Sequence, residues 1–180
     1  MIRKRNFKTH PKLVTLLLIC FMLSFFNASS YAQTSPVNQE KEFKNFYLTD
    51  MQNVKHKLSS YKGKWVIVNY WATWCPPCLE EVPDLVALYD SRKNKDVMVI
   101  GVVFDYESAD EVNSYVNDML MSYPIVLGDD NAVNQIGSAD VMPTTFIYNP
   151  KGTLVKIKRG LVTKSYLEEV MTGANLLKVK

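Results

Sequence analysis

Two cysteines separated by two residues are the feature of this chain most capable of chemistry. They lie in the segment Trp74-Cys75-Pro76-Pro77-Cys78. A pair at this spacing supports dithiol–disulfide exchange, in which one thiolate attacks a partner's disulfide and the second thiol resolves the mixed disulfide. A strand-like run precedes the pair and a helix-like run follows it, so Cys75 should lie at a helix N-terminus, where the partial positive charge favours a thiolate. We therefore expect Cys75, at the exposed end, to attack and Cys78, one turn into the helix and more buried, to resolve.

Three other uses of the cysteine pair compete with redox exchange. A structural zinc site needs four ligands, but after residue 32 the chain offers two cysteines and one histidine, His56. A purely structural disulfide would close so short a loop that it constrains the unfolded chain little. A copper site using both thiolates, with or without His56, is the strongest competitor, although a histidine between lysines is usually solvated. The residues favour redox exchange, with no metal and no cofactor beyond the cysteine pair itself, since no Gly-rich phosphate loop or metal signature appears.

The N-terminal residues follow the order of a secretory signal peptide. Five basic residues and no acidic residue lie in residues 1–12, before the apolar stretch Leu13 to Phe26 and a possible cleavage site after Ala32. The 14-residue apolar stretch is shorter than the roughly 20 residues that span a bilayer, and a retained membrane anchor is the alternative. We expect residues 1–32 to direct export and residues 33–42 to form a flexible leader. The rest of the chain is then expected in the periplasm or on the extracytoplasmic face of the cytoplasmic membrane, where disulfides persist.

Most of the excess positive charge belongs to that N-terminal segment. The whole chain has 21 Lys and Arg against 18 Asp and Glu, but residues 33–180 have 16 against 18. No basic stripe indicates nucleic-acid binding, and we expect no nucleic-acid partner. The 148 residues after position 32 are enough for one domain with a sizeable core.

The remaining sequence alternates strand-like and helix-like segments. Continuous apolar runs predict two buried strands, Trp65 to Trp71 and Val97 to Phe104. Periodicity and capping residues predict shorter strands at 43–48, 54–58 and 125–127, helices at 76–91, 108–121, 131–136 and after Thr163, and a hairpin of 144–148 with 153–158. This order predicts an α/β domain over residues 43–180. A mixed central sheet should be flanked by helices, with an N-terminal β extension and a central αβ insertion.

The segment Val68-Asn69-Tyr70-Trp71-Ala72-Thr73-Trp74-Cys75-Pro76-Pro77-Cys78 resembles the active-site segment of the thioredoxin superfamily. More narrowly, it resembles that of the exported TlpA/ResA-like thiol–disulfide oxidoreductases. Residues 58–64 and the segment Val141-Met142-Pro143-Thr144-Thr145-Phe146 are similar to two further parts of that family, the latter to its cis-proline loop. The resemblance extends from about Phe43 to Val170 and implies a thioredoxin-like fold and thiol–disulfide oxidoreductase activity.

The resemblance also implies roles for individual positions. Cys75 and Cys78 match the redox pair, and Pro143 matches the cis-proline that lies against the disulfide. A cis Pro143 would leave the Met142 backbone free to pair with an extended substrate strand. Trp74 fits either substrate contact or a cap over the active-site helix. The substrate-binding residues we expect are Trp74, Pro76, Met142, Pro143 and Thr144.

Proton transfer is expected to involve Glu81. Asn69 stands where thioredoxin has a buried aspartate, and a neutral amide cannot take a proton from Cys78. The resemblance supplies Glu81 as a substitute, three residues after Cys78 and therefore on the same helix face. The alternative is that Glu81 is a solvated helix carboxylate like its neighbour Glu80.

The two prolines between the cysteines bear on the direction of electron flow. Pro76 and Pro77 have no N–H to donate to a Cys75 thiolate, and a less stabilised thiolate makes a more reducing couple. We therefore expect a reductant. The resemblance implies disulfide-containing exported proteins such as apocytochrome c as substrates, and re-reduction by a membrane electron donor of the DsbD or CcdA type. A disulfide oxidase or isomerase, or a copper-handling thioredoxin-fold module, remains the alternative.

Overall fold

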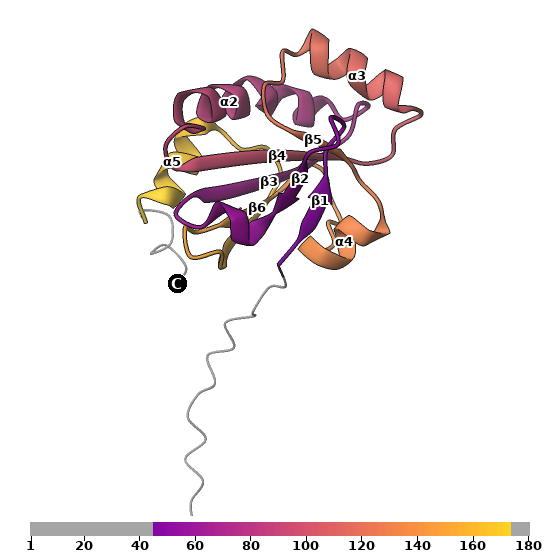
Figure 1. The fold of residues 1–180 in the computed structure, drawn as a ribbon. Helices are drawn as coiled ribbons and strands as arrows, with labels where there is room; N and C mark the ends of the chain where they lie inside the picture. Colours follow the sequence, from indigo (N-terminus) through magenta and orange to yellow (C-terminus); the bar gives the residue numbers. More distant parts are fainter. Residues whose placement is uncertain (1–44, 174–180) are drawn as a thin grey trace, which may run out of the picture. The chain divides into compact units, whose positions relative to one another are not determined.

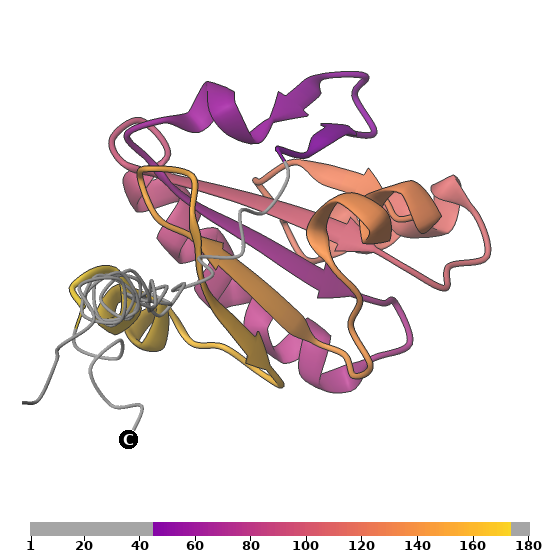
Figure 2. The same cartoon turned by 90° about the horizontal axis from the view of Figure 1, so that it is seen from below.

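A five-stranded mixed sheet forms the centre of the computed structural model, which describes residues 45–173 (Figure 1). Its strands, in the spatial order β5-β4-β3-β6-β7, are β5 Ile125–Leu127, β4 Val97–Val103, β3 Trp65–Trp71, β6 Thr144–Tyr148 and β7 Leu154–Arg159. The first three run parallel, β6 is antiparallel to β3, and β7 is antiparallel to β6. Figure 2 shows the same sheet from below. The predicted mixed sheet is confirmed.

Helices cover both faces of the sheet, as the alternating pattern predicted. The helices are α2 Pro76–Arg92, α3 Ala109–Asp118, α4 Asp130–Ile136 and α5 Lys164–Met171. Buried side chains of α2, α3 and α5 share one hydrophobic core cluster, and those of α4 share a second cluster. None of the helices in residues 45–173 is long and apolar enough to cross a membrane.

The central strand β3 is buried on both faces, which explains its continuous apolar sequence. Because side chains alternate along a strand, Ile67 and Trp71 join the core cluster on the α2 side, and Val68 and Tyr70 join the opposite cluster. Asn69 lies between Ile67 and Trp71 on the α2 side and is 1% exposed. A polar side chain in that position needs hydrogen-bond partners, because burying an unpaired amide is costly.

The N-terminal β extension is present but shorter than predicted. It consists of β1 Tyr47–Thr49 and β2 Lys55–Lys57, which pair antiparallel and form a separate two-stranded sheet. The predicted second strand ends before Leu58, where the 3-10 helix η1 Leu58–Tyr61 begins. The predicted signal segment, residues 1–32, and the leader, residues 33–42, lie outside the described residues.

His56 is buried, and the expectation that it would be solvated was wrong. Its Nε2 lies 2.9 Å from Asp50 Oδ2, and its Nδ1 lies 2.5 Å from the Tyr61 hydroxyl. Asp50 also accepts hydrogen bonds from the backbone N–H groups of Gln52 and Val54. The histidine therefore closes a polar network inside the β extension, because β1, the turn and η1 place an acid and a phenol around its ring.

Candidate active site

The two cysteines are disulfide-bonded at the start of α2. Cys75 is the N-cap residue of α2, and Pro76 and Pro77 are its first helical residues. Cys75 is 4% exposed and Cys78 is 0% exposed. The order of exposure agrees with the prediction, but Cys75 is not open to solvent in this form, because the closed disulfide packs in the core cluster on the α2 side.

The helix start offers no free backbone donor to the Cys75 sulfur. Pro76 and Pro77 lack an N–H, and the next two N–H groups, of Cys78 and Leu79, both donate to the Cys75 carbonyl at 3.0 and 3.2 Å. No side chain caps this helix start. Cys75 therefore has the helix dipole near it but none of the hydrogen bonds that usually stabilise a thiolate at a helix N-terminus.

The loop before β6 lies at the same end of the sheet as the cysteine pair, because Thr144 pairs with Tyr70 of β3. The Met142–Pro143 peptide bond is cis, as predicted. The Pro143 carbonyl accepts a hydrogen bond from Gly160 N at 2.8 Å. Within the described part of the chain, the Met142 backbone forms no hydrogen bond, while its side chain packs against the core cluster that holds both cysteines. The Met142 backbone is thus available to pair with a partner strand.

The other expected substrate-binding residues differ in accessibility. Trp74 is 59% exposed, and its indole Nε1 donates to the Asp105 carbonyl at 3.0 Å, which fixes the ring beside the disulfide. Pro76 is also exposed. Thr144 is 1% exposed and its hydroxyl donates to the Val141 carbonyl at 2.7 Å, so its side chain holds the loop instead of facing solvent.

Glu81 is completely buried, which overturns the alternative that it is a solvated carboxylate. Its Oε1 accepts from Asn69 Nδ2 at 2.7 Å, and its Oε2 accepts from the backbone N–H of Val162 at 2.8 Å. Asn69 Nδ2 also donates to Thr145 Oγ1 at 3.1 Å. Burial raises the pKa of Glu81 to about 7, against the opposing effects of the two hydrogen bonds and of the Lys158 charge. Glu81 can therefore exchange a proton near neutral pH.

Sequence reasoning identified Asn69 and Glu81 separately and missed the contact between them. It also missed Thr145 and Val162, which complete this buried network. These residues come from β3, α2, β6 and the segment before α5. No local sequence signal links them, because the contacts join positions 12, 76 and 81 residues apart.

His56 does not lie with the cysteine pair, so it does not offer a third ligand to a copper site there. Both of its ring nitrogens contact other side chains, those of Asp50 and Tyr61. Across residues 45–173, no three His, Cys, Asp or Glu side chains are grouped so that they could hold a metal ion.

Comparison with known proteins agrees with this site. Residues 40–157 match the model of the AhpC/TSA family. The thiol-disulfide oxidoreductase ResA of Bacillus subtilis is 32% identical over 166 residues, which cover 92% of this chain and 90% of that protein. The thiol-disulfide oxidoreductase ResA of Halalkalibacterium halodurans is 29% identical over 95% of this chain and 96% of that protein.

A solved structure shows the same likeness and confirms the predicted thioredoxin-like fold. StoA from Bacillus subtilis is 26% identical, with a TM-score of 0.61 over 71% of this chain and 96% of that chain. The chain therefore belongs to the AhpC/TSA family and, within it, to the ResA-like thiol–disulfide oxidoreductases of thioredoxin fold.

Proposed function

We propose that this enzyme is an exported disulfide reductase, whose thiol–disulfide exchange runs toward reduction of its substrates. We infer the direction of electron transfer from the start of α2, where no backbone N–H is free to donate to the Cys75 sulfur. A thiolate that lacks these bonds is less stable, which makes the dithiol form less favoured and the couple more reducing. An oxidase needs the opposite, a strongly stabilised thiolate.

Reduction of one substrate disulfide takes two steps. The Cys75 thiolate attacks one sulfur of a substrate disulfide, forms a mixed disulfide and releases the other substrate sulfur as a thiolate, which takes up a proton. Cys78 then loses its proton and attacks the Cys75 sulfur, which releases the second substrate thiol. The substrate gains two electrons and two protons, and the enzyme ends with the Cys75–Cys78 disulfide.

Glu81 is the group that we assign to the proton step. It lies three residues after Cys78 on α2, and both side chains are fully buried. A carboxylate whose pKa is about 7 can accept the Cys78 proton and return it to the leaving thiolate. Asn69 and the Val162 N–H hold the carboxylate in position and stabilise its ionised form.

The exposed surface beside the disulfide supports a protein substrate. Trp74 offers an aromatic face, and the Met142 backbone, which has no hydrogen-bond partner among residues 45–173, can pair with an extended strand. The signal-like N-terminal sequence supports an extracytoplasmic location, with residues 1–32 either cleaved or retained as a membrane anchor. We propose disulfides of exported proteins as substrates, among them the heme-binding cysteines of apocytochrome c, and a membrane electron donor of the DsbD or CcdA type as the source of electrons.

Redox titration tests the proposed direction. We expect a midpoint potential below that of the glutathione pool. Pro77→Ala should raise the potential by about 30–60 mV, because Pro77 is the second helical residue, whose N–H can reach the side chain of an N-cap residue, and one restored N–H bond to a thiolate contributes about 1.5–3 kcal/mol. Pro83→Ala, inside α2 and away from Cys75, is the matched control and should leave the potential unchanged. A wild-type potential above that of the glutathione pool would overturn the reductase proposal.

A further inference from the structure

Charged residues are distributed unevenly along this chain. Residues 97–150 contain eight Asp and Glu and no Lys or Arg. By contrast, basic residues gather in three loops, at residues 61–64, 92–96 and 149–153. We propose that these loops form one cationic surface, here called the basic end, which rests on a membrane that carries anionic phospholipid headgroups.

Backbone and side-chain hydrogen bonds join the three loops. Gly63 N donates to the Pro150 carbonyl at 2.9 Å, and Lys64 Nζ donates to the Lys93 carbonyl at 2.6 Å. A third bond joins Trp65 N to the Asp96 carbonyl at 2.7 Å. The basic end therefore lies at the N-terminal end of β3, opposite the end from which the chain reaches Cys75.

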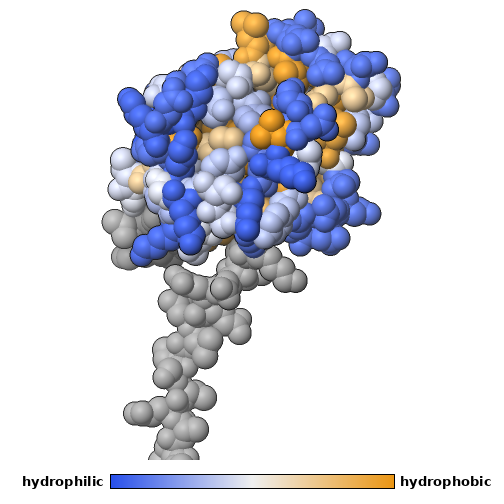
Figure 3. All heavy atoms as spheres, viewed as in Figure 1, coloured by the Kyte–Doolittle hydropathy of each residue, from blue (hydrophilic) through white to orange (hydrophobic). Residues whose placement is uncertain are grey.

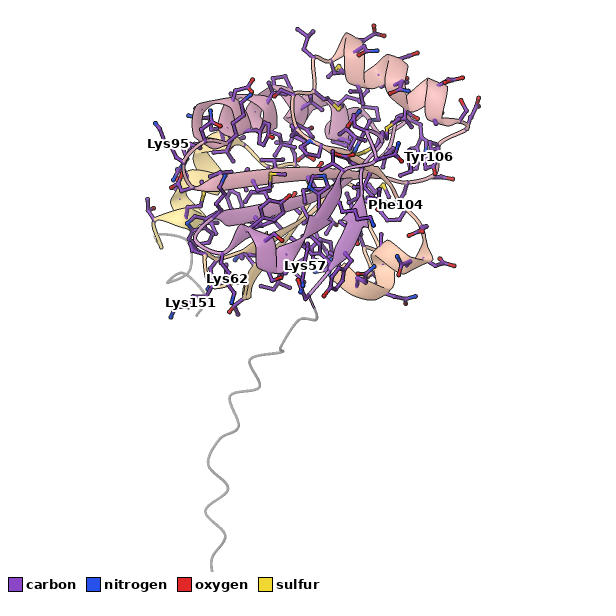
Figure 4. The ribbon with its side chains drawn as sticks, in the orientation of Figure 1. Lys57, Lys62, Lys95, Phe104, Tyr106 and Lys151 are labelled. Carbon is purple, nitrogen blue, oxygen red and sulfur yellow. A yellow bond between two sulfur atoms is a disulfide. The ribbon has the colours of Figure 1, made fainter. Side chains whose placement is uncertain are left out.

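Three lysines of the basic end are exposed, and in residues 45–173 they form no close ion pair, although Lys95 interacts electrostatically with Asp96. Arg92 pairs with Asp96, and Lys93 pairs with Asp90. Lys62, Lys95 and Lys151 are exposed and form no ion pair with any residue of the range 45–173. Figure 4 places these three side chains toward one end of the sheet and the labelled Phe104 and Tyr106 at the other. Their charges are free to attract an anionic partner.

The catalytic end has the opposite charge. The segment that follows β4 and begins α3, beside Trp74, contains four acidic residues and no basic residue: Asp105, Glu107, Asp110 and Glu111. The basic residues at that end are Lys158 and Arg159 on the edge strand β7. The two ends are separated by the seven residues of β3, about 20 Å. An anionic surface would therefore attract one end of the domain and repel the other.

A lipid surface fits the basic end better than a folded protein does. Protein interfaces usually centre on aromatic or apolar anchors, but the exposed large hydrophobic residues lie outside the three loops: Tyr47, Val54, Trp74, Leu120, Val141 and Ile157. In Figure 3 the left side of the visible face, where Figure 4 labels the three lysines of the basic end, is mainly hydrophilic. Lysine is a compact, flexible point charge, whereas specific phosphate recognition favours the arginine fork. Diffuse attraction to anionic headgroups needs only such lysines.

The point where the chain enters the domain supports the same orientation. Asn45, the first described residue, exchanges hydrogen bonds with Ser59 at 3.2 and 3.0 Å, three residues before Lys62. The described part of the chain therefore begins near the loop that carries Lys62, on the side that the proposal places against the lipid. The cysteine pair would then face away from the lipid, toward soluble substrates. This consequence rests on the proposed extracytoplasmic function, whereas lipid binding itself does not.

Vesicle partitioning of the full chain tests the inference. Phosphatidylcholine vesicles with and without phosphatidylglycerol would be compared for the wild type and for Lys62→Glu/Lys95→Glu/Lys151→Glu. The preference for anionic vesicles should fall at least about tenfold in the triple variant, because each lysine near such a surface contributes about 1 kcal/mol. High salt should remove the difference, because it screens exposed charges. The apolar N-terminal sequence is identical in both proteins, so its contribution to vesicle binding is the same in both measurements.

Lys55→Glu/Lys156→Glu/Arg159→Glu is the matched control, with the same change in net charge outside the basic end. It should change the preference less than about twofold, since its lysines and arginine lie away from the lipid. The glutamine version of the basic-end triple should give a smaller loss than the glutamate version. Reduction of a soluble disulfide without vesicles should be unchanged in the basic-end variants, which reports intact folding.

Equal preference in the wild type and the basic-end triple, or an equal loss in the control triple, would overturn the inference. Binding of the wild type to an acidic polypeptide but not to anionic vesicles would also overturn it. Neither result would alter the redox titration, so failure of the lipid inference is distinguishable from failure of the proposed function.

Discussion

Glu81 shows how one buried residue can be chemically useful without solvent. Isolation of a carboxylate in the core favours its neutral form, and two donated hydrogen bonds partly restore the charged form. The balance brings the pKa to about 7, so both forms are populated at neutral pH. Asn69 therefore contributes to this balance, because its side-chain N–H donates to the carboxylate and stabilises the ionised form.

Glu81→Gln should slow resolution of the mixed disulfide by about 100-fold, the typical contribution of a positioned acid or base. Only ionised Glu81 can accept the Cys78 proton, so the wild-type rate should rise as the pH increases through about 7. The variant should lack the inflection near pH 7 and should respond to pH only through ionisation of the Cys78 thiol itself. Stopped-flow measurement of a preformed mixed disulfide at Cys75 gives both the rate and its pH profile.

Glu80→Gln is the control, because Glu80 is the exposed neighbour on the same helix. Its resolution rate and pH profile should match the wild type. Equal resolution rates in the two variants would show that Glu81 does not take part in the proton transfer.

At the scale of residues, the sequence identified the redox pair, Pro143 and Glu81 because each stands in a motif or at a fixed spacing from one. It did not identify Thr145 or Val162, whose part in the site depends on the sheet register and on the path of the chain before α5. Thr144 was predicted beside a substrate, but its hydroxyl is turned inward to Val141.

At the scale of elements, the longest and most apolar segments were the most predictable. The bounds of β3 and of the short strand β5 are those predicted, and α2 extends one residue further, to Arg92. The short N-terminal elements were less predictable because their stability comes from tertiary contacts. The end of β2 is an example: Ser59 N bonds Asn45 Oδ1, and η1 forms where a strand was expected to continue.

The network of Asp50, His56 and Tyr61 should be a main support of the β extension. His56→Ala should lower the free energy of unfolding by about 3 kcal/mol, because it leaves the buried Asp50 carboxylate without its side-chain hydrogen-bond partner. Urea denaturation followed by tryptophan fluorescence measures the loss. Lys55→Ala, at an exposed neighbouring position, should change stability by less than about 0.5 kcal/mol. A similarly small change in the histidine variant would contradict this view of the network.

At the scale of the whole molecule, the chemistry is concentrated at one end of the sheet. The start of α2, the loop that holds Pro143 and the segment that carries Asp105 converge there, and the lysine-bearing loops converge at the other end. Net charge alone did not reveal this division, because it depends on which loops the topology brings together. The fold class and the reaction followed from the sequence, whereas the separation of charge required the structure.

The central claim is that Cys75 attacks substrate disulfides and Cys78 resolves the product. Trapping tests it most directly: Cys78→Ala, expressed in its native compartment, should accumulate mixed disulfides, and mass spectrometry should locate them at Cys75. Cys75→Ala should accumulate few, because Cys78 lies inside α2 and is the more buried of the two cysteines, whereas Cys75 lies at the helix start. Equal trapping by both variants, or adducts on neither, would contradict the account.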